Sequence, residues 1–328
     1  MSKNIVVFSD GTAKEGGQGP NTNVYKLFNM IEDRTADQVA FYDRGLGTGW
    51  RKITGLAFGV GISNNIQECY EFIFENYQSG DQIYLFGFSR GAFTVRSLSG
   101  FLHLFGILPK SRRELIDDAY DIYKIRDKEK RKARADEFLS RHHTMRCEIK
   151  FLGVWDTVGA LGLPVPIRFM DGWGPFKHEF HNTTLAENVK HGCHALSIDE
   201  QRAAFHPTFW KENPLVEQVW FPGVHSDVGG GYLEHDLSDI TLEWMVKKAK
   251  ADGLRIYSNH KVTADPNTDG VLHDSGSGIA RLFSKKQRTI EEESGKPKVH
   301  QSAVDRAGNQ GNEYNPWILN LEHDVESW

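Results

Sequence analysis

Residues 83–93 read IYLFGFSRGAF, and this stretch decides how the rest of the chain is interpreted. A short apolar run predicts a buried strand, and the pattern after Ser89 predicts a helix. Gly87 and Gly91 flank the serine in a G-x-S-x-G motif, and because glycine has no Cβ the backbone can turn sharply there. The turn would lift the Ser89 hydroxyl to a helix N-terminus, where backbone N–H groups favour developing negative charge. The pentapeptide alone occurs by chance in many chains, but its strand–turn–helix context predicts a nucleophilic serine.

The composition is typical of a soluble globular protein. The chain has 328 residues, of which 39% are hydrophobic and 25% charged, and its mean hydropathy is −0.49. That is enough for one large α/β domain or two ordinary ones. A net charge of −5 and a pI near 6.3 do not indicate a nucleic acid or an anionic membrane surface as a partner. The cysteines, at positions 69, 147 and 193, are too scattered for a disulfide framework or a zinc motif, so we expect no metal and a reducing compartment.

The N-terminal residues 1–8, MSKNIVVF, do not form a signal peptide pattern. They carry one basic residue and an apolar run of four residues, which is too short for a secretory leader. No stretch of the sequence approaches the ~20 apolar residues of a membrane span. We therefore expect a cytoplasmic protein without a transmembrane segment, and export by a secretion system that needs no N-terminal signal stays open.

Strand and helix patterns alternate along the chain, which predicts a parallel, doubly wound sheet. We expect strands at residues 5–9, 38–42, 83–88, 148–154 and 216–221. We expect helices at residues 24–32, 62–77, 90–102, 111–141, 185–196 and 237–251. The expected fold class is α/β and hydrolase-like, with helices on both faces of the sheet. We expect a single domain over residues 1–328, with an irregular insertion or lid at about 160–182 and an irregular C-terminal extension at about 258–328.

An acylating serine needs a base to take its proton and a carboxylate to orient that base. In α/β-hydrolases these groups follow the strands in the order Ser, acid, His. The chain offers Asp156 after one expected strand and His225 after a later one. We therefore expect His225 to act as the general base for Ser89 and Asp156 to hold the imidazole. The alternative roles are a turn cap for Asp156 and a structural histidine for His225.

Two other residues compete for the same roles. Asp227 is the rival acid, although two residues from His225 it could instead hold the glycine-rich loop that follows it. His300 is the rival base.

The oxyanion of the tetrahedral intermediate needs backbone donors. We expect one from Arg90 and a second from the loop after the first strand, near Gly11 or Thr12. Asp10 lies at the end of that strand and is expected to orient this loop or to bind substrate.

Phosphate chemistry is disfavoured by two details. Residues 8–12, FSDGT, are similar to the D-x-D-G-T start of haloacid-dehalogenase-like phosphatases, but Phe8 stands where the nucleophilic, magnesium-binding Asp belongs. The glycine-rich turn at residues 45–49 lacks the Lys-Ser/Thr ending of a P-loop. We expect no cofactor.

Five blocks of sequence together resemble the DUF2235 family. They are VFSDGT at 7–12, GFSRGAF at 87–93, GVWDTVG at 153–159, HALSIDE at 194–200 and PGVHSDVGGGY at 222–232. This is an uncharacterised α/β-hydrolase family that includes the catalytic domains of type VI secretion phospholipase effectors of the Tle1 type. The resemblance covers about residues 4–250, with a weaker echo at 300–302 and 314–316.

The resemblance implies an α/β-hydrolase fold and an esterase site of Ser89, Asp156 and His225, with lipid ester cleavage among relatives. The 328 residues are fewer than those of the effectors, and we expect no counterpart of their additional membrane-docking portion, so an antibacterial phospholipase and a housekeeping esterase both stay open. We predict a serine hydrolase acting on an ester or lipid through an acyl-enzyme on Ser89. One alternative is an amidase or thioesterase that uses the same residues. The other is a non-catalytic protein with a hydrolase fold that binds a component of a secretion or toxin system, such as an immunity protein.

Overall fold

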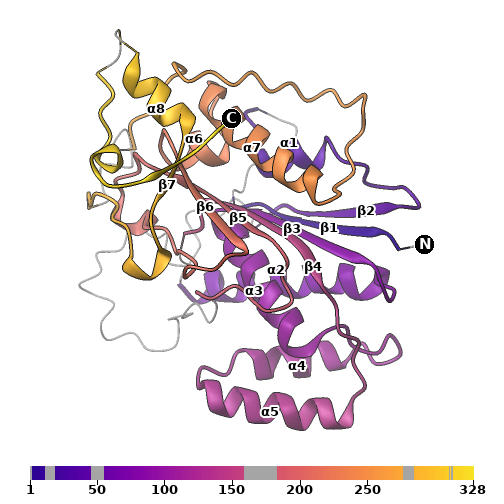
Figure 1. Cartoon of the computed structure of the whole chain (residues 1–328). Coiled ribbons are helices and arrows are strands. Elements are labelled where there is room, and N and C mark those ends of the chain that lie inside the picture. Colours follow the sequence, from indigo (N-terminus) through magenta and orange to yellow (C-terminus); the bar gives the residue numbers. More distant parts are fainter. Residues whose placement is uncertain are drawn as a thin grey trace.

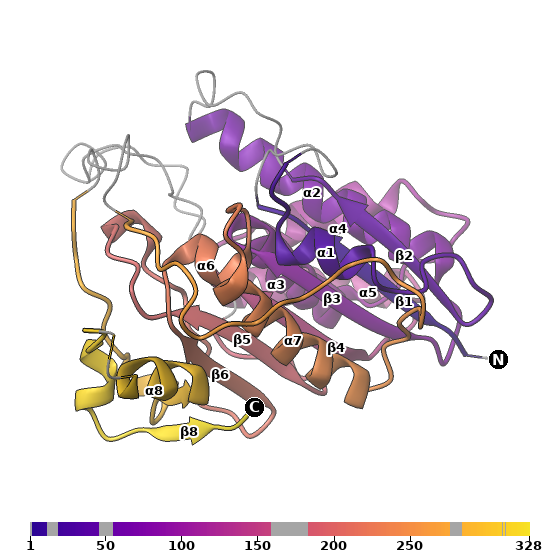
Figure 2. The same ribbon diagram turned by 90° about the horizontal axis from the view of Figure 1, so that it is seen from above.

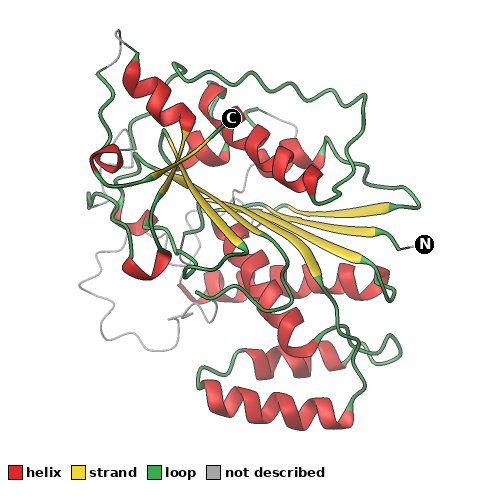
Figure 3. Cartoon of the chain, viewed as in Figure 1, coloured by secondary structure: helices red, strands yellow, loops and turns green. Residues whose placement is uncertain are grey.

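The computed structural model describes most of the chain. The described residues are 2–11, 19–45, 55–158, 183–275, 284–309, 311 and 313–328, with only the backbone of 55–60. In this part of the chain eight parallel strands form one sheet in the order β2-β1-β3-β4-β5-β6-β7-β8 (Figures 1 and 3). The strands are β1 (Asn4–Ser9), β2 (Gln38–Asp43), β3 (Gln82–Phe88), β4 (Ile149–Trp155), β5 (Gly192–Ser197), β6 (Val216–Phe221), β7 (Lys298–His300) and β8 (Asp324–Glu326). The α-helices are α1 (Asn23–Phe28), α2 (Gly55–Asn76), α3 (Arg90–Phe105), α4 (Leu115–Tyr123), α5 (Lys128–Arg141), α6 (His225–Gly229), α7 (Asp236–Ala251) and α8 (Gln301–Gly308).

The sheet is covered by helices on both faces, as the alternation of strands and helices predicted. Successive side chains of a strand point to opposite faces. Ile5 and Val7 therefore join the core beneath α2, α3, α4 and α5, whereas Val6 and Phe8 join the core beneath α1, α6 and α7. Figure 1 shows these two groups of helices on either side of the strands. The α/β, doubly wound fold class is confirmed.

The C-terminal part of the chain differs from the irregular extension that we expected. Strands β7 and β8 add to the sheet beside β6, and α8 follows β7 directly (Figure 2). A third apolar cluster, which includes Trp220, Val299 and Ile318, packs this region onto the sheet. Three-residue strands are too short to show a periodic pattern, so the sequence did not reveal them.

The helix expected at 185–196 is wrong, because this segment contains strand β5. Its residues are all buried between β4 and β6, with His194 paired in register with Val154 and Gln218. A strand buried on both faces shows no alternation of polar and apolar residues, so its sequence resembles a buried helix.

The remaining differences are at the ends of elements. The first expected helix ends at Phe28, and the charged segment 111–141 divides into α4 and α5. The insertion expected at about 160–182 lies outside the described residues.

The order of the strands creates a switch point beside the serine. Strand β1 lies between β2 and β3, so the connections from β1 to β2 and from β2 to β3 run in opposite directions across the sheet. In such sheets the loops at the carboxyl ends of the two strands separate and leave a crevice for a ligand. Here those loops begin at Asp10 and at Ser89.

Candidate active site

Ser89 occupies a strained turn between β3 and α3. Its φ is 57° and its ψ is −118°. Among the described residues other than glycine, Ser89 and Asp156 alone have positive φ. The glycines of the motif are needed for close approach: a Cβ on Gly87 would lie 2.5 Å from the Gly91 carbonyl oxygen, and one on Gly91 would lie 1.9 Å from the Ser9 carbonyl oxygen. The close packing of the backbone therefore excludes any larger residue at positions 87 and 91.

The structure brings Ser89, His225 and Asp156 together in one line of hydrogen bonds. Ser89 Oγ lies 2.9 Å from His225 Nε2, and His225 Nδ1 lies 2.5 Å from Asp156 Oδ2. The three residues follow β3, β6 and β4 respectively, so all lie at the carboxyl ends of the strands. With its proton on Nδ1, the imidazole donates to the carboxylate and accepts the serine proton at Nε2. This is the geometry that a general base needs.

The imidazole of His225 is fixed from several sides. The rings of Phe88 and Phe205 lie 4.6 Å and 5.0 Å from the imidazole, measured between centroids. The backbone N–H of His225 donates to the buried carboxylate of Glu200. Only 5% of His225 is exposed, so its orientation is set by the protein rather than by water.

Asp156 is held by a residue that the sequence did not reveal, Arg288. The Arg288 guanidinium donates to Asp156 Oδ1 at 2.6 Å and to Oδ2 at 2.8 Å, and it also donates to the carbonyls of Ser197 and Phe205. The backbone N–H of Ser197 donates to Oδ1 as well. Arg288 lies in a polar segment without any motif, so no sequence signal marks it. A bidentate Arg–carboxylate pair fixes both the position and the charge of the acid.

Asp156 is fully buried, and burial is the strongest single influence on its pKa, in the upward direction. The charge and hydrogen bonds of Arg288, together with the hydrogen bond from His225, outweigh burial and hold the pKa of Asp156 well below its usual range. These contacts therefore favour the ionised form of Asp156, which is the form that can orient an imidazole.

The expected oxyanion donors lie beside the serine as far as the structure describes them. A Cβ on Gly11 would lie 2.7 Å from Ser89 Cβ and 2.9 Å from Arg90 N, so the loop after β1 touches the turn. The Arg90 side chain binds this loop by donating from Nε to the Gly11 carbonyl at 3.1 Å. Arg90 is the first residue of α3, so its backbone N–H lies at the positive end of that helix. Thr12 lies outside the described residues.

Asp10 supports the same loop. Its buried carboxylate accepts hydrogen bonds from the hydroxyls of Tyr42, at 2.9 Å, and Thr22. These contacts join the end of β1 to β2 and to the start of α1. Protein donors therefore occupy Asp10 Oδ2.

The rival acid, Asp227, does not contact the His225 ring nitrogen that Asp156 binds. Its carboxylate accepts from the backbone N–H of Val224 at 2.9 Å and lies 2.6 Å from His273 Nδ1. Asp227 therefore fixes the turn that precedes His225 and connects it to a later segment of the chain. His273 is a second residue that the sequence did not single out.

The rival base, His300, is not brought to Ser89. It ends β7 and caps α8, where its Nδ1 lies 2.9 Å from Ser302 Oγ. Its ring stacks on Phe221 with 4.6 Å between centroids. Burial lowers the pKa of His300 to about 4, so it is neutral near pH 7.

His194, on strand β5, supports the loop that carries Asp156. Its Nε2 accepts the backbone N–H of Thr157 at 3.1 Å. Burial lowers the pKa of His194 to about 3, which keeps this nitrogen available as an acceptor.

Among the described residues, His191, Cys193 and Glu217 have side chains close enough together to bind one metal ion. They lie at the amino ends of the strands, opposite to the ends where Ser89 lies.

Comparison with known proteins gives a family match and a curated relative. Residues 3–248 match the family described as type VI secretion system phospholipase effector Tle1-like, catalytic domain. The uncharacterised protein YEL023C of Saccharomyces cerevisiae is 28% identical over 245 residues, which are 66% of this chain and 34% of the yeast protein. The chain thus spans about a third of the length of that curated relative.

Two solved structures are similar to part of the chain. An uncharacterised protein from Pseudomonas aeruginosa gives a TM-score of 0.49 at 18% identity, covering 78% of this chain and 46% of that one. The Tle1 effector bound to the VgrG spike of the type VI secretion system gives 0.43 at 20% identity, covering 70% and 51%. None of the described helices has both the length and the apolar character to cross a membrane. Because the family match extends over well more than half of its residues, this chain belongs to the Tle1-like catalytic domain family of type VI secretion phospholipase effectors.

Proposed function

We propose that this chain hydrolyses a carboxylic ester of a lipid through an acyl-enzyme formed on Ser89. One observation carries the proposal: Ser89 Oγ, the His225 imidazole and the Asp156 carboxylate form a continuous chain of hydrogen bonds of 2.9 Å and 2.5 Å. Membership of a family of phospholipase catalytic domains supports a lipid as the substrate. The strained backbone of Ser89 supports a reactive rather than a structural serine.

In the first half of the reaction, Ser89 Oγ attacks the acyl carbonyl carbon and gives its proton to His225 Nε2. Asp156 stabilises the imidazolium that forms, and Arg288 keeps Asp156 ionised and in position. The C–O bond to the alcohol then breaks, and His225 returns the proton to the leaving alcohol.

In the second half, water takes the place of the alcohol. His225 removes a proton from the water as it attacks the acyl-serine, and Ser89 leaves with that proton as the fatty acid is released. In both halves the negative charge on the carbonyl oxygen would be met by the backbone N–H of Arg90 at the start of α3 and by the loop that begins at Gly11.

A fluorophosphonate probe tests the nucleophile directly. We expect the probe to label Ser89 in the folded protein, and we expect Ser89→Ala to remove the label. Ser99→Ala is the matched control, because Ser99 lies on α3 and its hydroxyl donates to the Arg96 carbonyl. Folded protein that does not react at Ser89 would contradict the proposed mechanism and favour a non-catalytic binding role.

The substrate class is tested with p-nitrophenyl esters of increasing chain length and with phosphatidylcholine vesicles. A lipid hydrolase should act faster on long-chain esters and should release fatty acid from the vesicles. Activity confined to short esters would identify a small-ester esterase. Faster cleavage of matched amides or thioesters would replace the ester assignment while leaving Ser89 as the nucleophile.

A further inference from the structure

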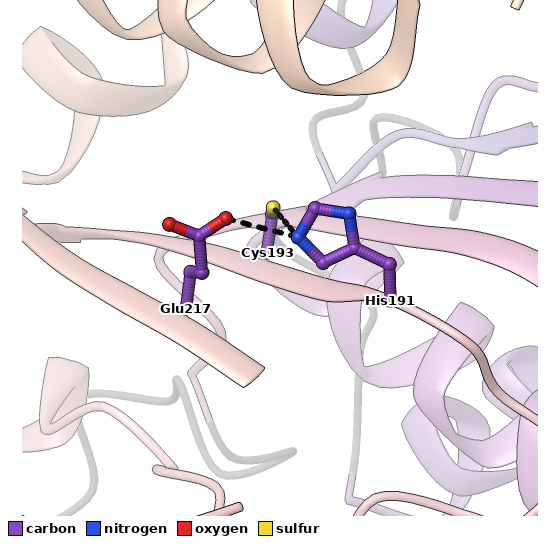
Figure 4. Close-up of side chains that lie close together, drawn as sticks. All are labelled: His191, Cys193 and Glu217. Atoms are coloured by element: carbon purple, nitrogen blue, oxygen red, sulfur yellow. Dashed lines mark hydrogen bonds and ion pairs between the residues drawn. The ribbon is translucent and has the colours of Figure 1, made fainter. Parts of the chain in front are cut away.

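Three side chains capable of binding a metal converge at the amino ends of β5 and β6. His191 immediately precedes β5, Cys193 is the second residue of that strand, and Glu217 is the second residue of β6. Figure 4 shows the imidazole, the sulfur and the carboxylate pointing toward one another. Ser89 follows β3 at its carboxyl end, so this group is separate from the candidate active site.

The three ligand atoms already have the spacing of a metal site. His191 Nε2 lies 3.0 Å from Glu217 Oε1 and 3.4 Å from Cys193 Sγ, and all three atoms lie within 4.8 Å of one another. Bonds of ~2.0 Å to nitrogen and oxygen and ~2.3 Å to sulfur, in a tetrahedron, place ligand atoms about 3.3–3.6 Å apart. The observed separations that involve His191 differ from these by only a few tenths of an ångström.

Neighbouring residues orient two of the three ligands. Asp252 Oδ2 lies 2.5 Å from His191 Nδ1, so this carboxylate can accept a hydrogen bond from Nδ1–H and leave Nε2 directed at the other two ligands. Such a carboxylate–histidine pair is the usual support of a zinc-binding histidine. Lys248 donates to Glu217 Oε2 at 2.7 Å, which leaves Oε1 directed at His191.

We propose that His191 Nε2, the Cys193 thiolate and Glu217 Oε1 bind a zinc ion. Imidazole, thiolate and carboxylate together are ligands typical of zinc. Cys193 is buried, whereas His191 and Glu217 each have 23% of the side chain exposed, so the ion can enter from solvent and water can complete its coordination. The ion would join β5 to β6 and, through Asp252, to the end of α7.

Without a metal, the same residues would form an ion-pair network in which a protonated His191 bridges Glu217 and Asp252. The two arrangements differ in the role of Cys193, because its sulfur is a ligand in the metal site and takes no part in the ion-pair network. Lys248 and Lys298 approach Glu217 in either case, at 2.7 Å and 3.6 Å.

The test uses the full chain, stripped with a chelator and then titrated with Co²⁺ and Zn²⁺. We expect one Co²⁺ to bind with a thiolate-to-metal charge-transfer band, and we expect Zn²⁺ to displace it. Cys193→Ser should remove the band, and Glu217→Gln should weaken binding about 10-fold or more. Cys69→Ser and Cys147→Ser are the matched controls, because both thiols are buried elsewhere in the fold and should leave the band unchanged.

Zn²⁺ should also raise the Tm of the stripped wild-type chain by several degrees and leave the Tm of Cys193→Ser unchanged, because a ligand stabilises only a state that binds it. The proposal fails if the wild type shows no charge-transfer band, or if Cys193→Ser keeps the band. The esterase activity of Cys193→Ser should equal that of the wild type, so a failure of the zinc site and a failure of the proposed hydrolase activity would be distinguishable.

Discussion

The two ends of the same parallel sheet are built in different ways. At the carboxyl ends, Ser89 and Asp156 both have positive φ, and the side chains of the candidate site are 7% exposed or less. At the amino ends, His191, Cys193 and Glu217 have no such backbone strain, and two of the three side chains are partly exposed. The carboxyl ends of the strands lead into loops and helix N-termini. Residues there can leave the regular strand conformation, and the backbone N–H groups of a helix N-terminus can stabilise a polar or negatively charged group. The difference indicates that strain accompanies the candidate chemistry, whereas the amino-end cluster arises from side chains of ordinary strands.

The largest effect expected at the carboxyl end comes from Asp156→Asn. The amide cannot hold the same imidazole tautomer or stabilise the imidazolium, so kcat for an ester should fall about 10⁴-fold. Steady-state kinetics on a p-nitrophenyl ester would measure this, with Cys193→Ser at the amino end as the control that keeps full activity. A loss of less than tenfold would remove Asp156 from the catalytic role.

Arg288→Gln should have the next largest effect, because it removes the cation that holds Asp156. Each charge-assisted hydrogen bond is worth about 1.5–3 kcal/mol, so we expect kcat to fall about 100-fold with little change in KM. The acid limb of the pH–rate profile should move to higher pH, because the cation that favours the ionised acid is gone.

The matched control for this variant is Arg96→Gln. Arg96 is also fully buried, and its guanidinium donates to the carbonyls of Thr208 and Phe209. Its removal should lower stability without moving the pH profile. Arg288→Lys should restore part of the activity. If Arg288→Gln and Arg96→Gln behave alike, Arg288 is structural.

A variant of His300 would test whether a buried histidine at the carboxyl end of a strand belongs to the candidate active site. Its pKa is about 4 in the folded protein and about 6.5 in the unfolded chain, so between these values the unfolded chain binds a proton that the native protein does not. The free energy of unfolding should therefore fall as the pH falls below about 6.5, by about 2 kcal/mol near pH 5 from this histidine. His194 acts in the same direction.

Urea unfolding at several pH values would measure this slope. His300→Asn keeps an N-cap on α8. It should reduce the dependence of the free energy of unfolding on pH by the uptake of up to one proton, without loss of esterase activity at pH 7. A variant that loses activity while it stays folded would return His300 to the list of candidate bases.

The smallest effect is expected from Gly11→Ala. The new Cβ would lie 2.5 Å from the Phe88 carbonyl oxygen and 2.7 Å from Ser89 Cβ, so the loop must move away from the serine. A displaced oxyanion donor should lower kcat about 10-fold, measured on the same ester. Gly308→Ala is the control, because no atom lies within 4 Å of its added Cβ. Equal activity of both variants would exclude a catalytic contribution from this loop.

Local patterns in the sequence were sufficient for the elements that are long and regular. Strands β1, β3, β4 and β6 and helices α3 and α7 follow from apolar runs and helical spacing, and all lie close to the expected residues. Helix α2 ends close to the expected residue but begins at Gly55, seven residues before the expected start at 62. The pentapeptide around Ser89 was interpretable for the same reason, because a strand, a turn and a helix are adjacent in sequence. Strand β5 was missed because it is buried on both faces and shows no alternation of polar and apolar residues, and β7 and β8 were missed because three residues are too few to show a periodic pattern.

The sequence by itself determined the α/β class, the turn that presents Ser89, and the order in which an acid and a histidine follow it. The tertiary structure alone decided that His225 meets Asp156 rather than Asp227, that Arg288 holds that acid, and that Cys193 lies beside His191 and Glu217. The physical reason is that parallel strands align their ends in space, whatever their separation along the chain. Hydrogen bonds among those ends depend on register and on crossing connections, and neither is contained in a local pattern of residues.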